Sequence, residues 1–490
     1  MSTPSIYWHD YETFGADPRR DRPAQFAGLR TDLDLNVIGE PLTLYCRPAD
    51  DFLPQPDACL VTGITPQLAL EEGLPEAEFI ARIHAEFIQP NTCVSGYNNI
   101  RFDDEVTRNT LYRNFHDPYA REWQNGNSRW DIIDLVRVTH ALRPDGIQWP
   151  QRDDGATSFR LEDLTRANGL QHQAAHDALS DVQATIDIAR LIRDRQPRLY
   201  NYIFRHRGKQ AVRELLDVAR RTPVLHVSSM YPASLGCIAL VSPLAVHPRY
   251  RNEIIVYDLR QDPAPYVDLP TEELRERLFT RQDDLPEGID RLPVKTIHIN
   301  KCPVVVPAGT LTAEAATRWQ IDRVISQRHW QCLQSHPAFV QNLARVFAER
   351  SYEPETDPDL MLYAGGFFSN DDRRCMEIIR HTRAEALGAL ALPFEDSRLP
   401  EMLFRYRARN YPATLTQDER QAWEVYRQGR LTDPACGAGI TDQVFCRRMG
   451  ELLDDEHLAP MQRAILRQLL EYRNQLLDTP CSEDFTARLK

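Results

Sequence analysis

Two acidic residues, Asp10 and Glu12, stand directly after the apolar run Ile6-Tyr7-Trp8, where a buried strand would normally stay apolar. Side chains two apart in a strand point to the same face, so the two carboxylates should lie side by side, about 7 Å apart along the backbone. Adjacent carboxylates repel and are costly to bury, and a divalent cation such as magnesium or manganese removes that cost. For an isolated pair, however, a strand end that runs into a solvated acidic turn is the stronger interpretation.

A third carboxylate, Asp103, follows a second predicted strand. The apolar run at 93–97 leads into Asn99-x-x-Phe102-Asp103, which opens a helix that we expect to run to about Phe115. An acid at a helix N-terminus is also favoured by capping and by the helix dipole. Asp103 taken alone could therefore be purely structural.

A histidine and a fourth carboxylate mark the start of a later helix. The stretch His176-Asp177-Ala178-Leu179-Ser180-Asp181 leads into apolar residues at helical spacing. His176 should lie in the loop or first turn, and Asp181 about one turn in. One alternative is an N-terminal turn capped by Asp177. A zinc site of His172 and His176 is weak, because no further soft ligand lies nearby.

Aromatic and basic residues alternate in the segment after Asp103. In proteins that hold single strands, aromatic rings stack on bases and arginines bind phosphates. The alternative is an ordinary helix with a packed aromatic side. The segment contains Arg108, Tyr112, Arg113, Phe115, Tyr119, Arg121, Trp123, Arg129 and Trp130.

The charge and composition restrict the class of protein. A net charge of −13 argues against non-specific binding of nucleic acid over the whole surface. Residues 198–221 nevertheless hold seven basic and two acidic residues, and form either part of a basic groove or a solvated helix face. No apolar run approaches the roughly 18 residues of a membrane span, and no signal segment is expected. Ten scattered cysteines without a Cys-x-x-Cys pair argue against a zinc site and a disulfide framework, and suit a reducing cytoplasm.

The hydrophobic pattern predicts three successive parts of the chain, the first mixed α/β, the second mainly β and the third mainly helical. Residues 5–46 should form a strand, an irregular loop and a strand. Ser158 is a candidate N-cap. Residues 404–411 alternate aromatics and arginines, as either a nucleic-acid surface or a packed helix. We expect helices over 75–88, 130–142, from 158, and 271–279, short strands between 224 and 306, and helices from about 312 onward.

Four carboxylates, one histidine and no thiol cluster suit a phosphodiesterase site with two metal ions about 4 Å apart. In this hypothesis Asp10 bridges the ions. Glu12 and Asp181 complete the ion that carries the attacking water, and Asp103 helps to hold the second ion. His176, with a reference pKa of about 6.5, accepts the proton of the water.

The ordered set Asp-x-Glu, Asn-x-x-Phe-Asp and His-x4-Asp resembles the proofreading-exonuclease superfamily of the type with a histidine in its third motif. Over nearly the whole chain, further stretches are similar to the bacterial exodeoxyribonuclease I family. These stretches are His9–Phe14, Asp21–Phe26, Gly96–Asn99, Ile299–Pro303 and Tyr406–Asn410.

The resemblance implies an RNase H-like mixed-sheet exonuclease domain at 1–196, a SH3-like β domain at 197–350 and an all-helical C-terminal domain at 351–490. It implies processive 3′–5′ degradation of single-stranded DNA to 5′-mononucleotides with two Mg²⁺ ions, for which Mn²⁺ could substitute. The setting would be cytoplasmic DNA repair and recombination.

The resemblance also implies particular contacts. It places Glu12 and Arg160 near the terminal nucleotide and makes Arg108, Tyr119 and Trp123 candidate strand contacts. Proteins of this family also dock on the acidic C-terminal tail of single-stranded DNA-binding protein. Arg143 and Tyr202 are the candidates here, and both could equally be ordinary surface residues. A monomer is expected.

Two rival functions stay open at this point. A 3′–5′ exoribonuclease or a proofreading exonuclease commonly needs only the first domain, so the two further domains argue against it. A non-catalytic single-stranded DNA-binding scaffold would not need the complete set of acidic residues.

Overall fold

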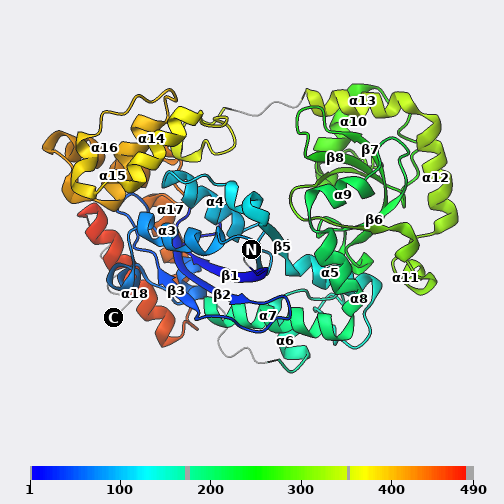
Figure 1. The fold of residues 1–490 in the computed structure, drawn as a ribbon, viewed down its shortest axis with the longest axis horizontal. Coiled ribbons are helices and arrows are strands. Elements are labelled where there is room, and N and C mark those ends of the chain that lie inside the picture. The colour runs from blue at the N-terminus through cyan, green and yellow to red at the C-terminus, as the bar shows by residue number, and fades with distance from the viewer. Residues whose placement is uncertain (1–2, 171–176, 350–353, 480, 482–490) are drawn as a thin grey trace. The chain divides into compact units, whose positions relative to one another are not determined.

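The computed structural model describes residues 3–170, 177–349, 354–479 and 481, and Figure 1 shows the course of the chain. The chain divides into two compact units, each discontinuous in sequence. Unit 1 comprises Met1–Ser128, Gln173–Gln183 and Pro354–Lys490, and unit 2 comprises Arg129–His172 and Ala184–Glu353. Each unit is described by itself.

The N-terminal part of the chain forms a five-stranded mixed sheet with the strand order β3-β2-β1-β4-β5. The central strand β1 pairs antiparallel with β2 and parallel with β4. This sheet confirms the predicted α/β class with a mixed sheet. Its strands are β1 (Ser5–Thr13), β2 (Pro23–Thr31), β3 (Leu42–Tyr45), β4 (Thr92–Gly96) and β5 (Ser128–Asp131).

Two expectations about this sheet were wrong. The predicted irregular loop contains β2, which is buried on both faces and therefore lacks the alternation of a half-exposed strand. The helix predicted from Trp130 begins at Ile132, because Trp130 lies in β5 and Asp131 caps the helix by accepting the N–H of Ile133.

Unit 1 surrounds its strands with helices from both ends of the sequence. Phe79, Ile80 and Ile83 from α3 pack against Tyr7 and Val94 of the sheet. The helices of the N-terminal part are α1 (Pro56–Thr62), α2 (Pro66–Glu72), α3 (Glu76–Phe87) and α4 (Asp103–Arg113). Those of the C-terminal part are α14 (Asn370–His381), α15 (Leu399–Asn410), α16 (Gln417–Thr432), α17 (Asp442–Leu453) and α18 (Pro460–Leu477).

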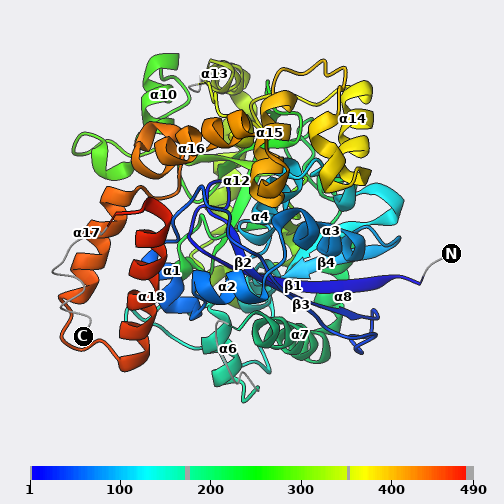
Figure 2. The same cartoon turned by 90° about the vertical axis from the view of Figure 1, so that its left-hand side faces the viewer.

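The C-terminal helices complete an apolar core that the N-terminal part begins. Figure 2 shows α17 and α18 beside α1 and α2. Phe445 of α17 and Leu466 and Leu469 of α18 are fully buried in one cluster with Phe14 and Phe52. Sequence positions about 400 residues apart therefore share one core.

A buried ion network joins the same two parts. Arg409 of α15 contacts Asp51 at 2.8 Å and Asp359 at 2.7 Å, and the three side chains are at most 5% exposed. Arg405 adds a contact to Asp359 at 3.1 Å, and Arg430 of α16 one to Asp51 at 3.4 Å. The arginines of the 404–411 segment thus serve packing, and of the two interpretations the packed helix is the one observed.

Unit 2 holds a five-stranded antiparallel sheet in the order β10-β6-β7-β8-β9. Its core includes Val224, Val241, Val256 and Val305. The strands are β6 (Val224–Val227), β7 (Ile238–Val246), β8 (Glu253–Asp258), β9 (Val294–His298) and β10 (Val304–Pro307). The helices are α5 (Ile132–Leu142), α6 (Leu161–Ala167), α8 (Pro197–His206), α9 (Lys209–Leu215), α10 (Thr271–Phe279), α11 (Ala313–Arg318), α12 (Arg323–Ser335) and α13 (Pro337–Ala348), while α7 (Ala178–Arg195) begins in unit 1 and continues into unit 2.

Local contacts explain several sequence patterns of unit 2. The basic window 198–221 lies mainly in α8 and α9. The prediction that Ser158 caps a helix was wrong. Helix α6 begins at Leu161, and the Ser158 hydroxyl donates to Asp163 at 2.6 Å. Arg129 donates to the Asn300 carbonyl at 2.7 Å, which ties the Ile299–Pro303 motif to the chain just after Ser128.

A disulfide joins Cys446 and Cys481, whereas the sequence argued against a disulfide framework. The other eight cysteines, all of them within the described residues, are not part of a disulfide. Among the described residues, no helix has the length and apolar character to cross a membrane.

Candidate active site

Asp10 and Glu12 lie in the body of β1, and the strand continues to Thr13. The intervening Tyr11 therefore points to the other face of the sheet, where it packs against Phe26 with ring centroids 4.9 Å apart. Glu12 is 8% exposed and Asp10 is half-buried. The predicted pairing of the two carboxylates on one face is thus present.

Asp103 is held against the same strand. It is the first residue of α4, is 4% exposed, and its Oδ1 accepts the backbone N–H of Tyr11 at 3.0 Å. This hydrogen bond holds the Asp103 carboxylate at the backbone of Tyr11, the residue between Asp10 and Glu12. Asp103 consequently has a structural contact as well as a place beside the acidic pair.

Asp181 completes the cluster from the first turn of α7. One carboxylate oxygen from each of Asp10, Glu12 and Asp181 lies within 4.8 Å of the other two. The three side chains come from β1 and α7, and sequence spacing alone could not show that these elements meet. All three belong to unit 1.

Electrostatics show what this cluster requires. Burial, and then the charges of Asp103, Glu12 and Asp181, raise the pKa of Asp10 well above its usual range. Burial and Asp181 likewise raise the pKa of Glu12 to about 8. A bound divalent cation would remove this repulsion, and an all-oxygen donor set fits a hard cation. The residues present therefore fit a divalent metal site.

His176 and His172 lie outside the described residues. The neighbouring Asp177 is exposed, and its Oδ2 accepts the N–H of Ser180 at 3.2 Å. Asp177 thus caps α7, as the plainer interpretation of this stretch proposed. That cap leaves the carboxylate of Asp181 in the acidic cluster.

The three candidate strand contacts of unit 1 differ in exposure. Trp123 is 67% exposed, and Tyr119 is half-buried with its ring 6.0 Å from that of Phe367. Arg108 is only 3% exposed, and its guanidinium binds Glu122 at 2.7 Å and Glu105 at 2.8 Å. Trp123 is therefore the member most available to a ligand.

Arg160, Arg143 and Tyr202 belong to unit 2. Arg160 is exposed and directly precedes α6. Arg143 is half-buried at the end of α5, and its guanidinium donates to the Thr310 carbonyl at 3.4 Å. Tyr202 stacks on His206 with ring centroids 4.0 Å apart. The roles given to these three residues stay predictions.

Sequence reasoning missed the residues that support the acidic strand. Gln25 of β2 is 4% exposed and directly opposite Glu12. Asp21 accepts the Asp17 N–H at 2.8 Å and the Gln55 side-chain amide at 2.9 Å, and so orders the loop after β1. A Cβ at Gly15 would come within 2.2 Å of this carboxylate, so the close approach needs glycine. The stretch Asp21–Phe26 was noted for its similarity to the family, but the strand that begins at Pro23 was not predicted.

Three family models match the chain. The model described as Exonuclease covers residues 7–189, Exonuclease I SH3-like domain covers 207–349, and Exonuclease I C-terminal domain covers 356–476. Among curated proteins, exodeoxyribonuclease I of Escherichia coli K12 is 48% identical over 475 residues, with 96% of this chain and 98% of the relative covered.

Solved structures agree in fold. Exonuclease I from Methylocaldum szegediense superposes with a TM-score of 0.93 at 53% identity, covering 97% of this chain and all of the other. E. coli exonuclease I with a dA16 oligonucleotide superposes with a TM-score of 0.92 at 47% identity and the same coverage. Two further neighbours at 46% identity are a zinc-bound E. coli complex with single-stranded DNA and a structure of SSB/exonuclease I with an inhibitor.

Proposed function

Because the chain belongs to the exodeoxyribonuclease I family, we propose that it degrades single-stranded DNA processively from the 3′ end and releases 5′-mononucleotides. The exonuclease activity itself follows from the family. The direction, the strand preference and a place in cytoplasmic DNA repair and recombination are the proposed details. The predicted domain limits at 1–196, 197–350 and 351–490 are retained in this proposal.

The observation that supports the proposal is the carboxylate cluster. Asp10, Glu12 and Asp181 offer oxygen ligands within 4.8 Å of one another, and Asp103 is fixed to the same strand by the Tyr11 N–H. Two divalent cations, for which we propose Mg²⁺ with Mn²⁺ as a substitute, would supply Lewis-acid stabilisation of the scissile phosphate and lower the pKa of the attacking water.

The proposed roles of the residues follow the reaction. Water attacks the last phosphorus, the bond to the 3′ oxygen of the preceding nucleotide breaks, and the phosphate leaves with the terminal nucleotide. The freed 3′ oxygen takes up a proton from solvent and becomes a hydroxyl. Asp10, Glu12, Asp103 and Asp181 hold and orient the ions. His176 would take the proton of the attacking water, for which its ordinary pKa near 6.5 is suited.

Substrate and partner contacts belong to the same proposal. Glu12 and Arg160 would bind the terminal nucleotide, while Arg108, Tyr119 and Trp123 would contact the strand. Arg143 and Tyr202 would bind the acidic C-terminal tail of single-stranded DNA-binding protein. The relatives solved with single-stranded DNA and with SSB support these two classes of partner. We propose that the protein works as a monomer.

The decisive experiment uses a 5′-labelled single-stranded DNA, its blunt duplex and an RNA of the same sequence. We expect magnesium-dependent shortening of the single-stranded DNA alone, and none with chelator. Shortening of RNA would favour an exoribonuclease, and no shortening would favour a binding scaffold. Asp181→Ala and His176→Ala should abolish shortening while folding is retained, and unchanged rates would remove these residues from the mechanism.

A further inference from the structure

Gln25 of β2 lies beside the acidic pair of β1. The two strands are antiparallel, and their register places Gln25 directly opposite Glu12 and Ala27 opposite Asp10. Residues opposite each other in such a pair point to the same face of the sheet, with Cβ atoms about 4.5–5.5 Å apart. Gln25 therefore brings a side-chain amide next to the Glu12 carboxylate, on the face that carries the acidic cluster.

The strand pairing changes immediately after this position. Thr13 pairs with Pro23, so Ala24 is an extra residue of β2 and forms a β-bulge. A bulge bends its strand and re-aims the neighbouring side chains, and bulges are common next to active sites. Glu12 and Gln25 thus form the last regular pair before the bend.

The amide of Gln25 is enclosed by the protein but is not used within it. Gln25 is only 4% exposed, and no described residue forms a hydrogen bond with its side chain. Tyr45 of β3 lies opposite Gln25 on the other side, but the Tyr45 side chain packs against the apolar cluster that contains Phe14. Because an amide in such a position is costly without a partner, the Glu12 carboxylate is the acceptor that remains for it in the sheet.

The charged groups that act on Glu12 are acidic. Burial raises the pKa of Glu12, and the charges of Asp181, Asp103 and Asp177 raise it further. A fixed positive charge beside Glu12 would compete with a bound cation for this negative charge. An amide N–H donates a hydrogen bond without carrying a charge, so Gln25 leaves the charge of the cluster available to the cation.

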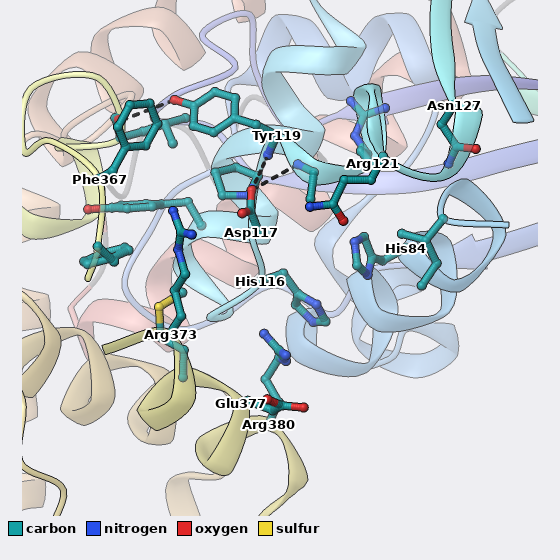
Figure 3. A pocket seen from close by; sticks show the side chains of 18 of the residues that line it. His84, His116, Asp117, Tyr119, Arg121, Asn127, Phe367, Arg373, Glu377 and Arg380 are labelled. Carbon is teal, nitrogen blue, oxygen red and sulfur yellow. Dashed lines mark hydrogen bonds between the residues drawn. The ribbon is translucent and has the colours of Figure 1, made fainter. Parts of the chain in front are cut away.

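The positive charge of the segment after Asp103 is used elsewhere. Arg121 binds Asp104 at 2.7 Å, and both side chains are fully buried. Arg121 also lines a separate cavity of about 370 Å³ together with His84 and His116 (Figure 3). Gln25 therefore stands beside the acidic cluster as a neutral donor, while this arginine is neutralised by its own acid.

We propose that Gln25 is a positioning residue for Glu12. Its amide donates to one carboxylate oxygen of Glu12 and so holds the other oxygen toward the cation. The inference rests on the proposed function, because it requires a cation at Asp10, Glu12 and Asp181. Hydrogen-bond partners behind metal ligands fix the orientation of those ligands, and their loss typically costs about 10–100-fold in metal affinity or activity.

The test is calorimetric titration of the whole protein with Mn²⁺ in the absence of DNA, which measures binding and not turnover. Gln25→Met keeps the length of the side chain and removes its N–H donors, and it should weaken Mn²⁺ binding about tenfold or more. Gln67→Met is the matched control, because Gln67 of α2 donates its amide to the Gln468 carbonyl at 2.6 Å. The control should bind Mn²⁺ as the parent protein does.

Two further measurements separate positioning from a purely structural role. In chelator the urea midpoint of Gln25→Met should not fall below that of the parent protein, whereas loss of a structural contact would lower it. The rate of single-strand hydrolysis by Gln25→Met should be reduced at low Mn²⁺ and should recover as Mn²⁺ is raised. Gln25→Ala, a smaller side chain without a donor, should show the same pattern.

The outcomes distinguish this inference from the proposed function. Equal Mn²⁺ affinity of the parent protein and both Gln25 variants would overturn the role of Gln25 and leave the metal site intact. An equal loss of affinity in Gln67→Met would also overturn it, because the effect would not be specific to the acidic cluster. Absence of Mn²⁺ binding by the parent protein would overturn the metal site itself.

Discussion

At the scale of single residues, Asp103 does two things that can be separated. Its carboxylate stands beside the acidic cluster, and it also accepts the Tyr11 N–H. Asparagine keeps an acceptor oxygen but removes the charge, whereas alanine removes both.

We therefore expect Asp103→Asn to lower the rate of single-strand hydrolysis by about 100-fold or more, because a metal ligand supplies several kcal/mol of stabilisation to the transition state. Its melting temperature should stay near that of the parent protein. Asp103→Ala should show the same loss in the rate of hydrolysis and should also have a lower melting temperature. Equal melting of the two variants would show that the contact to Tyr11 contributes little.

Trp123 provides a second test at this scale. Its ring is 67% exposed, and stacking on a base contributes about 1–3 kcal/mol. Trp123→Ala should weaken the binding of a single-stranded oligonucleotide about tenfold without changing stability. Val425→Ala, at a position that is 72% exposed on α16, is the control and should change neither. Fluorescence anisotropy with a labelled oligonucleotide in chelator would measure both.

At the scale of elements, the buried ion network determines how α15 attaches. Burial alone would raise the pKa of Asp359, but Arg409 and Arg405 hold it well below its usual range. Removing one member of a buried pair leaves an uncompensated charge, at a cost of about 3–5 kcal/mol. Asp359→Ala should lower the urea midpoint accordingly, whereas Asp371→Ala, in an exposed pair, should change it little.

The depressed pKa of Asp359 also predicts how the stability of the protein depends on pH. A carboxylate whose pKa is depressed in the folded protein stabilises it fully above the unfolded pKa of about 3.9, and less as the pH falls below that value. The stability difference between the parent protein and Asp359→Asn should thus be constant from pH 5 to 8 and shrink below pH 4. A difference that shrank already at pH 6 would contradict this origin.

Sequence patterns predicted some elements better than others, for physical reasons. Helix α10 begins and ends at the expected residues, because its amphipathic repeat has clear limits. Strand β2 was missed because both of its faces are buried, which removes the alternation on which the prediction depends. The four carboxylates were found from local patterns, but the contact between β1 and the first turn of α7, which brings Asp181 to Asp10 and Glu12, is one that no local pattern contains.

At the scale of the whole molecule, the C-terminal helices belong to the same compact unit as the N-terminal part of the chain. Phe445, Leu466 and Leu469 are buried against residues of the first 70 positions. Burial of one such side chain contributes about 1.5–3 kcal/mol, and a domain has a net stability of only about 5–15 kcal/mol.

A chain that ends at residue 353 should consequently be insoluble or melt far below the full-length protein. Circular dichroism and sedimentation of the truncated and full-length proteins would measure this. Co-expression of residues 354–490 should restore solubility. A soluble, cooperatively melting truncation would show instead that the N-terminal part closes its own core.

The discontinuity of unit 1 has a consequence for synthesis on the ribosome. The surface of α1 and α2 leaves the exit tunnel long before α17 and α18 exist, since residues 72 and 442 are 370 positions apart. At about 5–20 residues per second, translation leaves this surface uncovered for roughly 20–75 s. During that interval the nascent chain carries an unfinished apolar face, which makes it a natural client for chaperones that bind chains still attached to the ribosome.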